Sequence, residues 1–205
     1  MRKVLIAAAA LAALAACAPR NPEVLPPEQL APLAYRSNTP PSVTVYTVLN
    51  QATGAGTHTA LLVNGSERVL FDPASGFKAE GVTRSGDVLY GYTPGVESAY
   101  FAVHDRHNFV VKTTTFALSA ESTERLLQQA KAYGPVAPAH CATSTIDILR
   151  TDPAFAALDT TYSPRKLGQQ LDQLPGARSG ELTSDMFRNV VQPEATKFDQ
   201  RPGGA

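Results

Sequence analysis

A single thiol in the second half of the chain is placed where nucleophilic chemistry is possible. Cys141 follows residues 135–140, whose two prolines disfavour regular helix, and it opens a stretch with apolar residues at helical spacing. We therefore expect Cys141 in the first turn of a helix. Unpaired N–H groups and the helix dipole favour a thiolate there and lower its pKa from about 8.5. The alternative is a buried, inert cysteine that packs as a small hydrophobic residue.

A thiolate nucleophile needs a base, and His58 is the best placed histidine. It stands at the start of an expected strand, residues 57–63, after the glycine-containing loop 52–56. The turn Asn64-Gly65-Ser66 predicts a hairpin whose second strand, residues 67–72, ends at Asp72. That hairpin would bring the Asp72 carboxylate to the far ring nitrogen of His58, in the order nucleophile, base and orienter. Alternatively, His58 is a structural residue and Asp72-Pro73 opens a turn.

The other histidines fit catalysis less well. His104 and His107 are expected in a solvated turn between two strands, and we find no convincing further ligand that would make them a metal site. His140 adjoins Cys141, but neighbouring side chains at a helix start diverge, so it would shape a pocket rather than act as the base. The sequence contains no nucleophile elbow, phosphate-binding loop or dinucleotide motif, and we expect no cofactor and no metal.

The elements that must position these residues change character halfway along the chain. Strands are expected at residues 43–49, 57–63, 67–72, 87–92, 98–104 and 108–117, which are rich in Val, Thr, Tyr and Phe. Helices are expected from Ser119 to Gly134, over residues 141–150, from Ser163 to Pro175 and, for a short fourth, over residues 183–190. Strands first and helices later predict an α+β fold with an antiparallel sheet and packed helices.

The N-terminus has the pattern of a bacterial lipoprotein signal peptide. Arg2 and Lys3 precede a short apolar run at residues 4–13, and Leu-Ala-Ala follows directly before Cys17. We expect cleavage after residue 16 and lipid on Cys17, which would anchor the protein to a membrane with its domain in the periplasm. An ordinary secreted protein is the alternative. Ala18 favours the outer membrane, and the cell membrane is the alternative. Lipid on Cys17 would leave Cys141 as the one free thiol.

Composition and proline content set the domain boundaries and exclude one class of partner. Removal of residues 1–16 takes away Arg2 and Lys3 and no acid, which leaves 16 basic against 18 acidic side chains. This balance argues against nucleic acid as a partner. Seven prolines between residues 18 and 41 predict an extended spacer, so residues 17–42 are expected to link the anchor to one domain, residues 43–192. Residues 193–205 are expected to be a flexible tail.

The order of His58, Asp72 and Cys141 resembles the circularly permuted papain-like hydrolases, the branch related to NlpC that includes lecithin:retinol acyltransferase-like proteins. The matching stretches are residues 57–62, 71–74 and 140–143, and the likeness extends over about residues 43–175. The resemblance implies a permuted papain-like fold with Cys141 as nucleophile, His58 as base and Asp72 as orienter. Many relatives have His or another polar residue as the orienter, which makes Asp72 the least secure of the three.

The resemblance also implies a class of reaction. It suggests a cysteine hydrolase or acyltransferase of the cell envelope that acts on an amide or ester. Peptidoglycan stem peptides are the favoured substrate, and acyl lipids are the other. The alternatives are a non-catalytic lipoprotein that binds peptide, lipid or a protein partner, and a structural lipoprotein in which Cys141 is merely packed.

Overall fold

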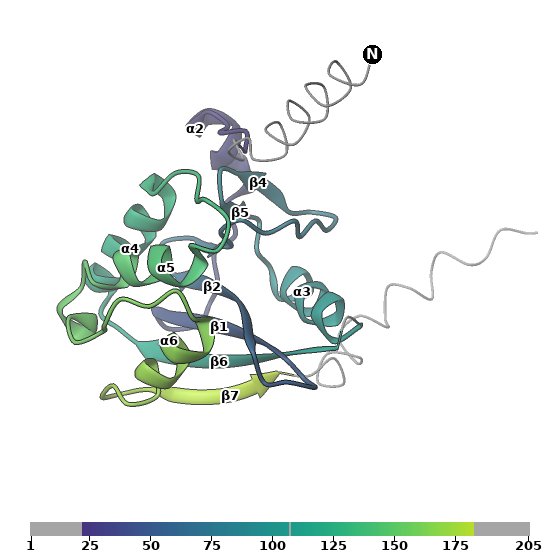
Figure 1. The fold of residues 1–205 in the computed structure, drawn as a ribbon. Coiled ribbons are helices and arrows are strands. Elements are labelled where there is room, and N and C mark those ends of the chain that lie inside the picture. Colours follow the sequence, from purple (N-terminus) through teal and green to yellow (C-terminus); the bar gives the residue numbers. More distant parts are fainter. Residues whose placement is uncertain (1–21, 107, 183–205) are drawn as a thin grey trace, which may run out of the picture.

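The computed structural model describes residues 22–106 and 108–182, and it confirms an α+β fold with an antiparallel sheet. Seven strands lie in the order β4-β5-β3-β2-β1-β6-β7 within these residues, and every neighbouring pair is antiparallel. Figure 1 shows helices on both sides of this sheet. Among the described residues, no helix combines the length and the apolar character needed to cross a membrane.

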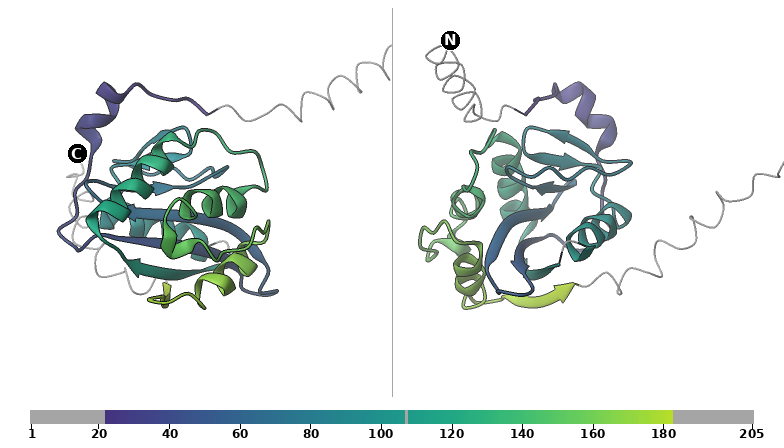
Figure 2. Two further views of the ribbon diagram at one scale, coloured as in Figure 1. Left: turned by 90° about the vertical axis from the view of Figure 1, so that its left-hand side faces the viewer. Right: turned by 45° about the vertical axis from the view of Figure 1, so that its right-hand side comes forward.

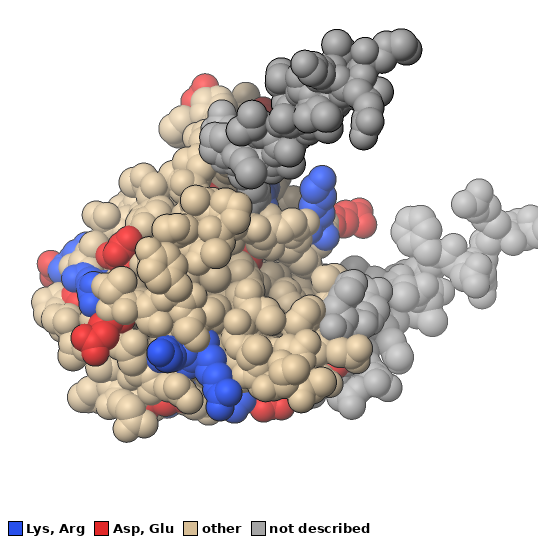
Figure 3. Space-filling view, viewed as in Figure 1, with Lys and Arg blue, Asp and Glu red and all other residues tan. Residues whose placement is uncertain are grey.

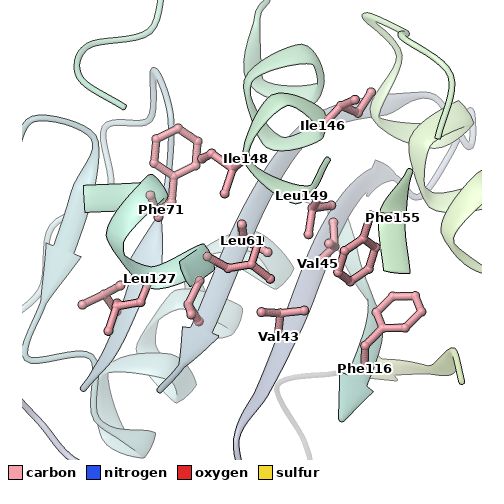
Figure 4. Close-up of a cluster of buried hydrophobic side chains, with 14 of the residues drawn as sticks. Val43, Val45, Leu61, Phe71, Phe116, Leu127, Ile146, Ile148, Leu149 and Phe155 are labelled. Carbon is pink, nitrogen blue, oxygen red and sulfur yellow. The ribbon is translucent and has the colours of Figure 1, made fainter. Parts of the chain in front are cut away.

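The sheet is buried on both faces, and the alternation along its strands decides which core each side chain joins. In β2 (Gly56–Asn64), Leu61 and Val63 belong to a core beneath α4, α5 and α6, whereas Ala60 and Leu62 belong to a second core beneath α3. Figure 4 shows the first core, where Leu61 and Phe71 of the sheet face Ile148 and Leu149 of α5. The helices on the two faces are seen apart in Figure 2. The central strands are therefore fixed by packing from two sides.

Four of the expected strands are present with small changes at their ends. β1 (Ser42–Asn50), β2, β3 (Arg68–Phe71) and β6 (Phe109–Ala117) cover the predicted segments, and the pairing of Leu61 with Phe71 confirms the β2–β3 hairpin. β5 (Val88–Tyr90) is shorter than predicted because Gly91 takes a φ of 71°. Two short edge strands, β4 (Thr83–Ser85) and β7 (Arg178–Leu182), were not expected.

The strand predicted at residues 98–104 is wrong, because this segment belongs to helix α3 (Pro94–Arg106). Proline is favoured in the first helical turn, and the Thr93 hydroxyl accepts the N–H of Val96 at the helix start. Val96 and Tyr100 stand four residues apart and are both buried in the core beneath α3. Burial of that stripe against the sheet outweighs the β propensity of the aromatic and β-branched residues. His104 therefore lies on a helix rather than in a turn between strands.

The predicted helices of the second half are confirmed where the structure describes them. α4 (Ala120–Ala132) begins after Ser119, whose side chain accepts the N–H of Ser122, and α6 (Pro164–Leu171) is capped by Ser163 in the same way. α5 (Cys141–Leu149) begins at the cysteine, and a short 3₁₀ turn, η2 (Pro153–Phe155), follows it. The fourth helix predicted at residues 183–190 and the tail at 193–205 lie outside the described residues.

The proline-rich segment is packed on the domain from Pro22 onward, which differs from the extended spacer that we expected. It contains α2 (Pro27–Leu30) and the 3₁₀ turn η1 (Ala31–Leu33), and Leu30 and Leu33 pack against the core beneath α4 and α5. Backbone hydrogen bonds join Glu23 to Gly86 and Tyr35 to Arg68. The prolines stiffen this segment, and apolar contacts hold it down. Cys17, the residue expected to carry lipid, lies outside the described residues.

Candidate active site

His58 is aimed by an irregularity in β2. Val48 of β1 pairs with His58, but the next residue, Leu49, pairs with Gly56, so Thr57 is one extra residue on β2. Such a β-bulge changes which face of the sheet the following side chains occupy. Gly56 consequently lies against the backbone of Arg165 at the start of α6, while His58 is directed toward Asp72.

Asp72 follows β3 and is fully buried. Since Leu61 pairs with Phe71, the register places Asp72 opposite Ala60, one diagonal step from His58. The Nε2 atom of His58 lies 2.8 Å from Asp72 Oδ1, as the hairpin predicted. The hydroxyl of Tyr100 also donates to this oxygen, at 3.3 Å, and Arg84 Nη2 donates to the other carboxylate oxygen at 2.6 Å. Every oxygen of the buried carboxylate thus has a donor.

Cys141 is the first residue of α5, which begins beside β2 (Figure 1). His58 and the backbone N–H groups of Thr59 and Ala142 lie near enough to the thiol to lower its pKa. β3 pairs with β2 only from Leu61 onward, so the edge of β2 at Thr59 has no β3 residue opposite it, and Cys141 lies near this edge. The structure therefore brings together all three predicted residues, Cys141, His58 and Asp72.

The electrostatics of the three groups favour a charged pair. Burial by itself raises the pKa of the Cys141 thiol, but the hydrogen bond to His58, the charge of His58 and the two N–H donors hold that pKa below its usual value. Burial lowers the pKa of His58, yet the bonds to Asp72 and Cys141 outweigh it and raise the pKa to about 9. Both shifts act in the same direction, toward a thiolate on Cys141 beside an imidazolium on His58.

Asp72 is kept ionised despite its burial. Desolvation raises the pKa of a carboxyl group, but the hydrogen bond and charge of His58, the charge of Arg84 and a hydrogen bond from Ser75 lower the pKa of Asp72 to about 2. Nε2 of His58 is engaged by Asp72, so Nδ1 is the ring nitrogen available to the thiol. The carboxylate therefore fixes both the orientation of the ring and which nitrogen serves Cys141.

The backbone on both sides of the site is held in an unfavourable conformation. Ala74 and Ala139 have φ angles of 56° and 66°, a region that costs a residue with a side chain about 1 kcal/mol or more. Asp87, itself buried, accepts the N–H of Ala74 at 3.3 Å and the N–H of Val136 at 2.8 Å. One carboxylate thus joins the turn after Asp72 to the loop that leads into Cys141.

Sequence reasoning missed three residues of this arrangement. Arg84 and Asp87 flank Ser85-Gly86, a turn signal that could have revealed the β4–β5 hairpin but not its contact with Asp72. Tyr100 was assigned to a strand, where it would not have been expected to reach the site. The contacts of these residues join segments far apart in sequence, so no local pattern contains them.

The other described histidines, His104 and His140, have partners other than Asp72. His140 is exposed, and its ring packs against Tyr162 with 5.2 Å between ring centres, while His104 Nδ1 lies 2.7 Å from the carbonyl oxygen of Tyr100. His107 is outside the described residues. Within the part of the chain that the structure describes, no group of three or more His, Cys, Asp or Glu side chains is placed to hold a metal ion.

Access to the thiol is narrow. Cys141 is 7% exposed, and the His58 side chain is 18% exposed. The middle of the face shown in Figure 3, on which α5 and α6 lie, has few charged side chains, and a group of Lys and Arg side chains lies below it, where Figure 1 places α6.

Comparisons of the chain with protein-family models, with curated proteins and with solved structures find no match in any of the three.

Proposed function

We propose that this protein is a lipid-anchored cysteine hydrolase or acyltransferase of the cell envelope, with a permuted papain-like domain. The observation that carries the proposal is that Cys141 and Asp72 both act on His58, which is hydrogen-bonded to Asp72 and lowers the pKa of the Cys141 thiol. A nucleophile, a base and an orienter in this order are the parts that acyl transfer needs. The start of α5 and the depressed pKa of Cys141 add support.

The geometry supports a two-step reaction. The Cys141 thiolate attacks the acyl carbon of an amide or ester, and the carbonyl oxygen takes the negative charge. His58 gives its proton to the departing amine or alcohol, which leaves a thioester on Cys141. Water or another acceptor then loses a proton to His58, attacks the thioester and releases the acyl product and the Cys141 thiolate, which restores the starting ion pair. The Cys141 N–H at the helix start is a donor for the oxyanion, a contact worth about 2.7–4 kcal/mol in other enzymes.

The substrate proposed first is a peptide amide of peptidoglycan, and an acyl lipid is the second. Both would be within reach of a periplasmic domain that is anchored through Cys17. The sparsely charged middle of the face in Figure 3 is compatible with a neutral amide or ester link.

A non-catalytic binding protein is the alternative, and the narrow access to Cys141 favours it. The structure also has a cavity of about 740 Å³ between residues 24–36 and the domain, lined by Leu30, Tyr90 and Lys131 among others. A peptide or lipid bound there would need no thiol chemistry.

The test separates these functions through the reactivity of Cys141. In the full chain carrying Cys17→Ser, Cys141 is the one thiol, and its alkylation by iodoacetamide can be followed by mass spectrometry from pH 4 to 10. We expect fast alkylation well below pH 8.5, and His58→Ala should slow it at pH 6–7 by at least tenfold, because the thiolate loses its cationic partner.

His140→Ala serves as the matched control, since it removes the histidine adjacent to Cys141 without touching Asp72. It should leave the alkylation profile close to that of the parent. Equal alkylation profiles for the parent and His58→Ala would contradict the role of His58 as the base and would favour the binding function. Incubation with peptidoglycan fragments and with acyl esters then identifies the substrate class by the product that Cys141→Ala fails to release.

A further inference from the structure

Arg84 is bound to Asp72 at two points. Its Nη2 atom donates to Asp72 Oδ2 at 2.6 Å, and its Nη1 atom donates to the Asp72 carbonyl oxygen at 2.9 Å. The Arg84 side chain is mostly covered, and Asp72 is fully buried. The guanidinium group therefore contacts the carboxylate from the side opposite His58, which bonds to the other oxygen.

We propose that Arg84 is a positioning residue that shares the Asp72 carboxylate with His58, so that Asp72 orients the imidazole without retaining its proton. This inference rests on the function proposed above. It assigns to β4, a strand at the edge of the sheet, a direct part in how the base behaves.

The two oxygens of the Asp72 carboxylate have different partners. One oxygen faces His58 and Tyr100, and the other faces Arg84. If Arg84 did not hold the second oxygen, the buried carboxylate would lose its one arginine donor and keep only the bonds from His58, Tyr100 and Ser75. The carboxylate would then relieve the loss by turning or by binding a proton. The two bonds from Arg84 prevent both.

Two cations, His58 and Arg84, share the Asp72 carboxylate, and Arg84 Nη1 also lies 3.8 Å from the buried carboxylate of Asp87. Around Asp72 the ionisable groups come from every packed element: His58 of β2, Cys141 of α5, Tyr100 of α3, Arg84 of β4, and Asp87 and Tyr92 on either side of β5. Arginine stays charged at any pH of interest. Its positive charge opposes that of the imidazolium across the carboxylate, and so weakens the hold of Asp72 on the His58 proton.

That weakening matters for the proposed reaction, because His58 must give its proton to the leaving group. An imidazolium beside a buried carboxylate with no other partner would keep its proton too firmly. The expected consequence is that removing the charge of Arg84 raises the pKa of His58. A substitution that loses the two bonds from Arg84 to Asp72 but keeps the positive charge should change the pKa of His58 much less.

The experiment measures the pH at which His58 loses its proton, through the alkylation rate of Cys141 in the full chain with Cys17→Ser. A thiolate–imidazolium pair gives two inflections, the lower from Cys141 and the upper from His58. Arg84→Gln keeps a donor but loses the charge, and it should move the upper inflection upward by about one pH unit, a tenfold change in proton affinity. Arg84→Lys should leave it near the parent value.

The chain offers a close control in Arg68, which has the same bonding pattern elsewhere. Arg68 Nη1 donates to the Tyr92 carbonyl oxygen at 2.6 Å, and its Nη2 donates to Glu97 at 2.8 Å. Arg68→Gln removes a covered arginine–carboxylate pair of the same kind. Urea unfolding of both variants measures how much each substitution lowers the free energy of unfolding. It should not move the upper inflection.

The outcomes are distinguishable. An unmoved or lowered upper inflection in Arg84→Gln, or an equal shift in Arg68→Gln, overturns the role of Arg84 while leaving the proposed function intact. A parent chain with one inflection near pH 8.5, unchanged in His58→Ala, overturns the proposed function itself.

Discussion

At the scale of single residues, Asp72 is where the contacts of the candidate site converge. It is fully buried, and its carboxylate accepts hydrogen bonds from His58, Tyr100 and Arg84. Sequence reasoning identified Asp72 from its place at the end of a strand, and the resemblance left it as the least secure of the three residues. The structure gives it more partners than either expected, because burial of a carboxylate requires that each oxygen be satisfied.

Asp72 also makes stability depend on pH in a predictable direction. Its pKa is about 2 in the folded protein and about 3.8 when unfolded, so its contribution is fully present above pH 4 and is lost as pH falls from 4 to 2. The loss should be on the order of 2 kcal/mol. Urea unfolding from pH 2 to 7 should show the stability advantage of the parent over Asp72→Asn narrowing across this range. Parallel curves would contradict the low pKa of Asp72.

At the scale of elements, the bulge in β2 and the start of α6 together place the site. Gly56 allows the backbone of Arg165 to come so close that an added Cβ would stand 2.4 Å from its nitrogen. That contact places α6 against one side of β2. The extra residue Thr57 turns the His58 side chain toward the opposite side of the strand. The bulge was not predicted, since nothing in the residues 52–58 distinguishes a strand with an extra residue from a regular one.

Gly56→Ala should therefore be costly. The new methyl group meets backbone rather than a flexible side chain, so α6 must move, and we expect a loss of about 2 kcal/mol or more in the free energy of unfolding. Gly76→Ala is the matched control, because no atom lies within 4 Å of the position of its Cβ. It should be neutral or slightly stabilising. Chemical denaturation of both variants measures the difference, and equal stabilities would contradict the close packing of α6.

α3 shows where element prediction failed for a physical reason. Residues 98–104 have aromatic and β-branched side chains that favour strands, and they form a helix because burial of Val96, Tyr100 and Phe101 on one stripe covers the second face of the sheet. That error also hid the Tyr100 contact with Asp72, because a strand in this position would not deliver the hydroxyl to the site.

At the scale of the whole molecule, the packing of the proline-rich segment limits the distance between the proposed lipid anchor and the domain. The chain is packed on the domain from Pro22, so only the residues between Cys17 and Pro22 are left to separate the proposed lipid from the domain. The five Cα–Cα steps from Cys17 to Pro22 span at most about 18 Å. If Cys17 carries lipid, the domain is held close to the membrane rather than at the end of a long spacer.

The packing of this segment is testable through Leu33, which contacts the core beneath α4 and α5. Leu33→Ala should lower the free energy of unfolding by about 1–2 kcal/mol, less than the 2–5 kcal/mol of a fully buried leucine because Leu33 is partly covered. Gln29→Ala, at an exposed position of α2, is the control and should change little. If Leu33→Ala unfolds like the control, the segment is the loose spacer that its composition predicts.

The parts of this protein that the sequence determined are those with local causes. Cys141 opens a helix because the prolines before it end where a helical pattern begins, and His58 meets Asp72 because one short turn sets the register of a hairpin. Tertiary structure decided the rest. The docking of α5 that brings Cys141 to His58, the Arg84 and Tyr100 contacts with Asp72, the helical state of α3 and the seating of residues 22–41 all depend on burial between distant segments. Such burial is decided by the whole fold, and no short stretch of residues encodes it.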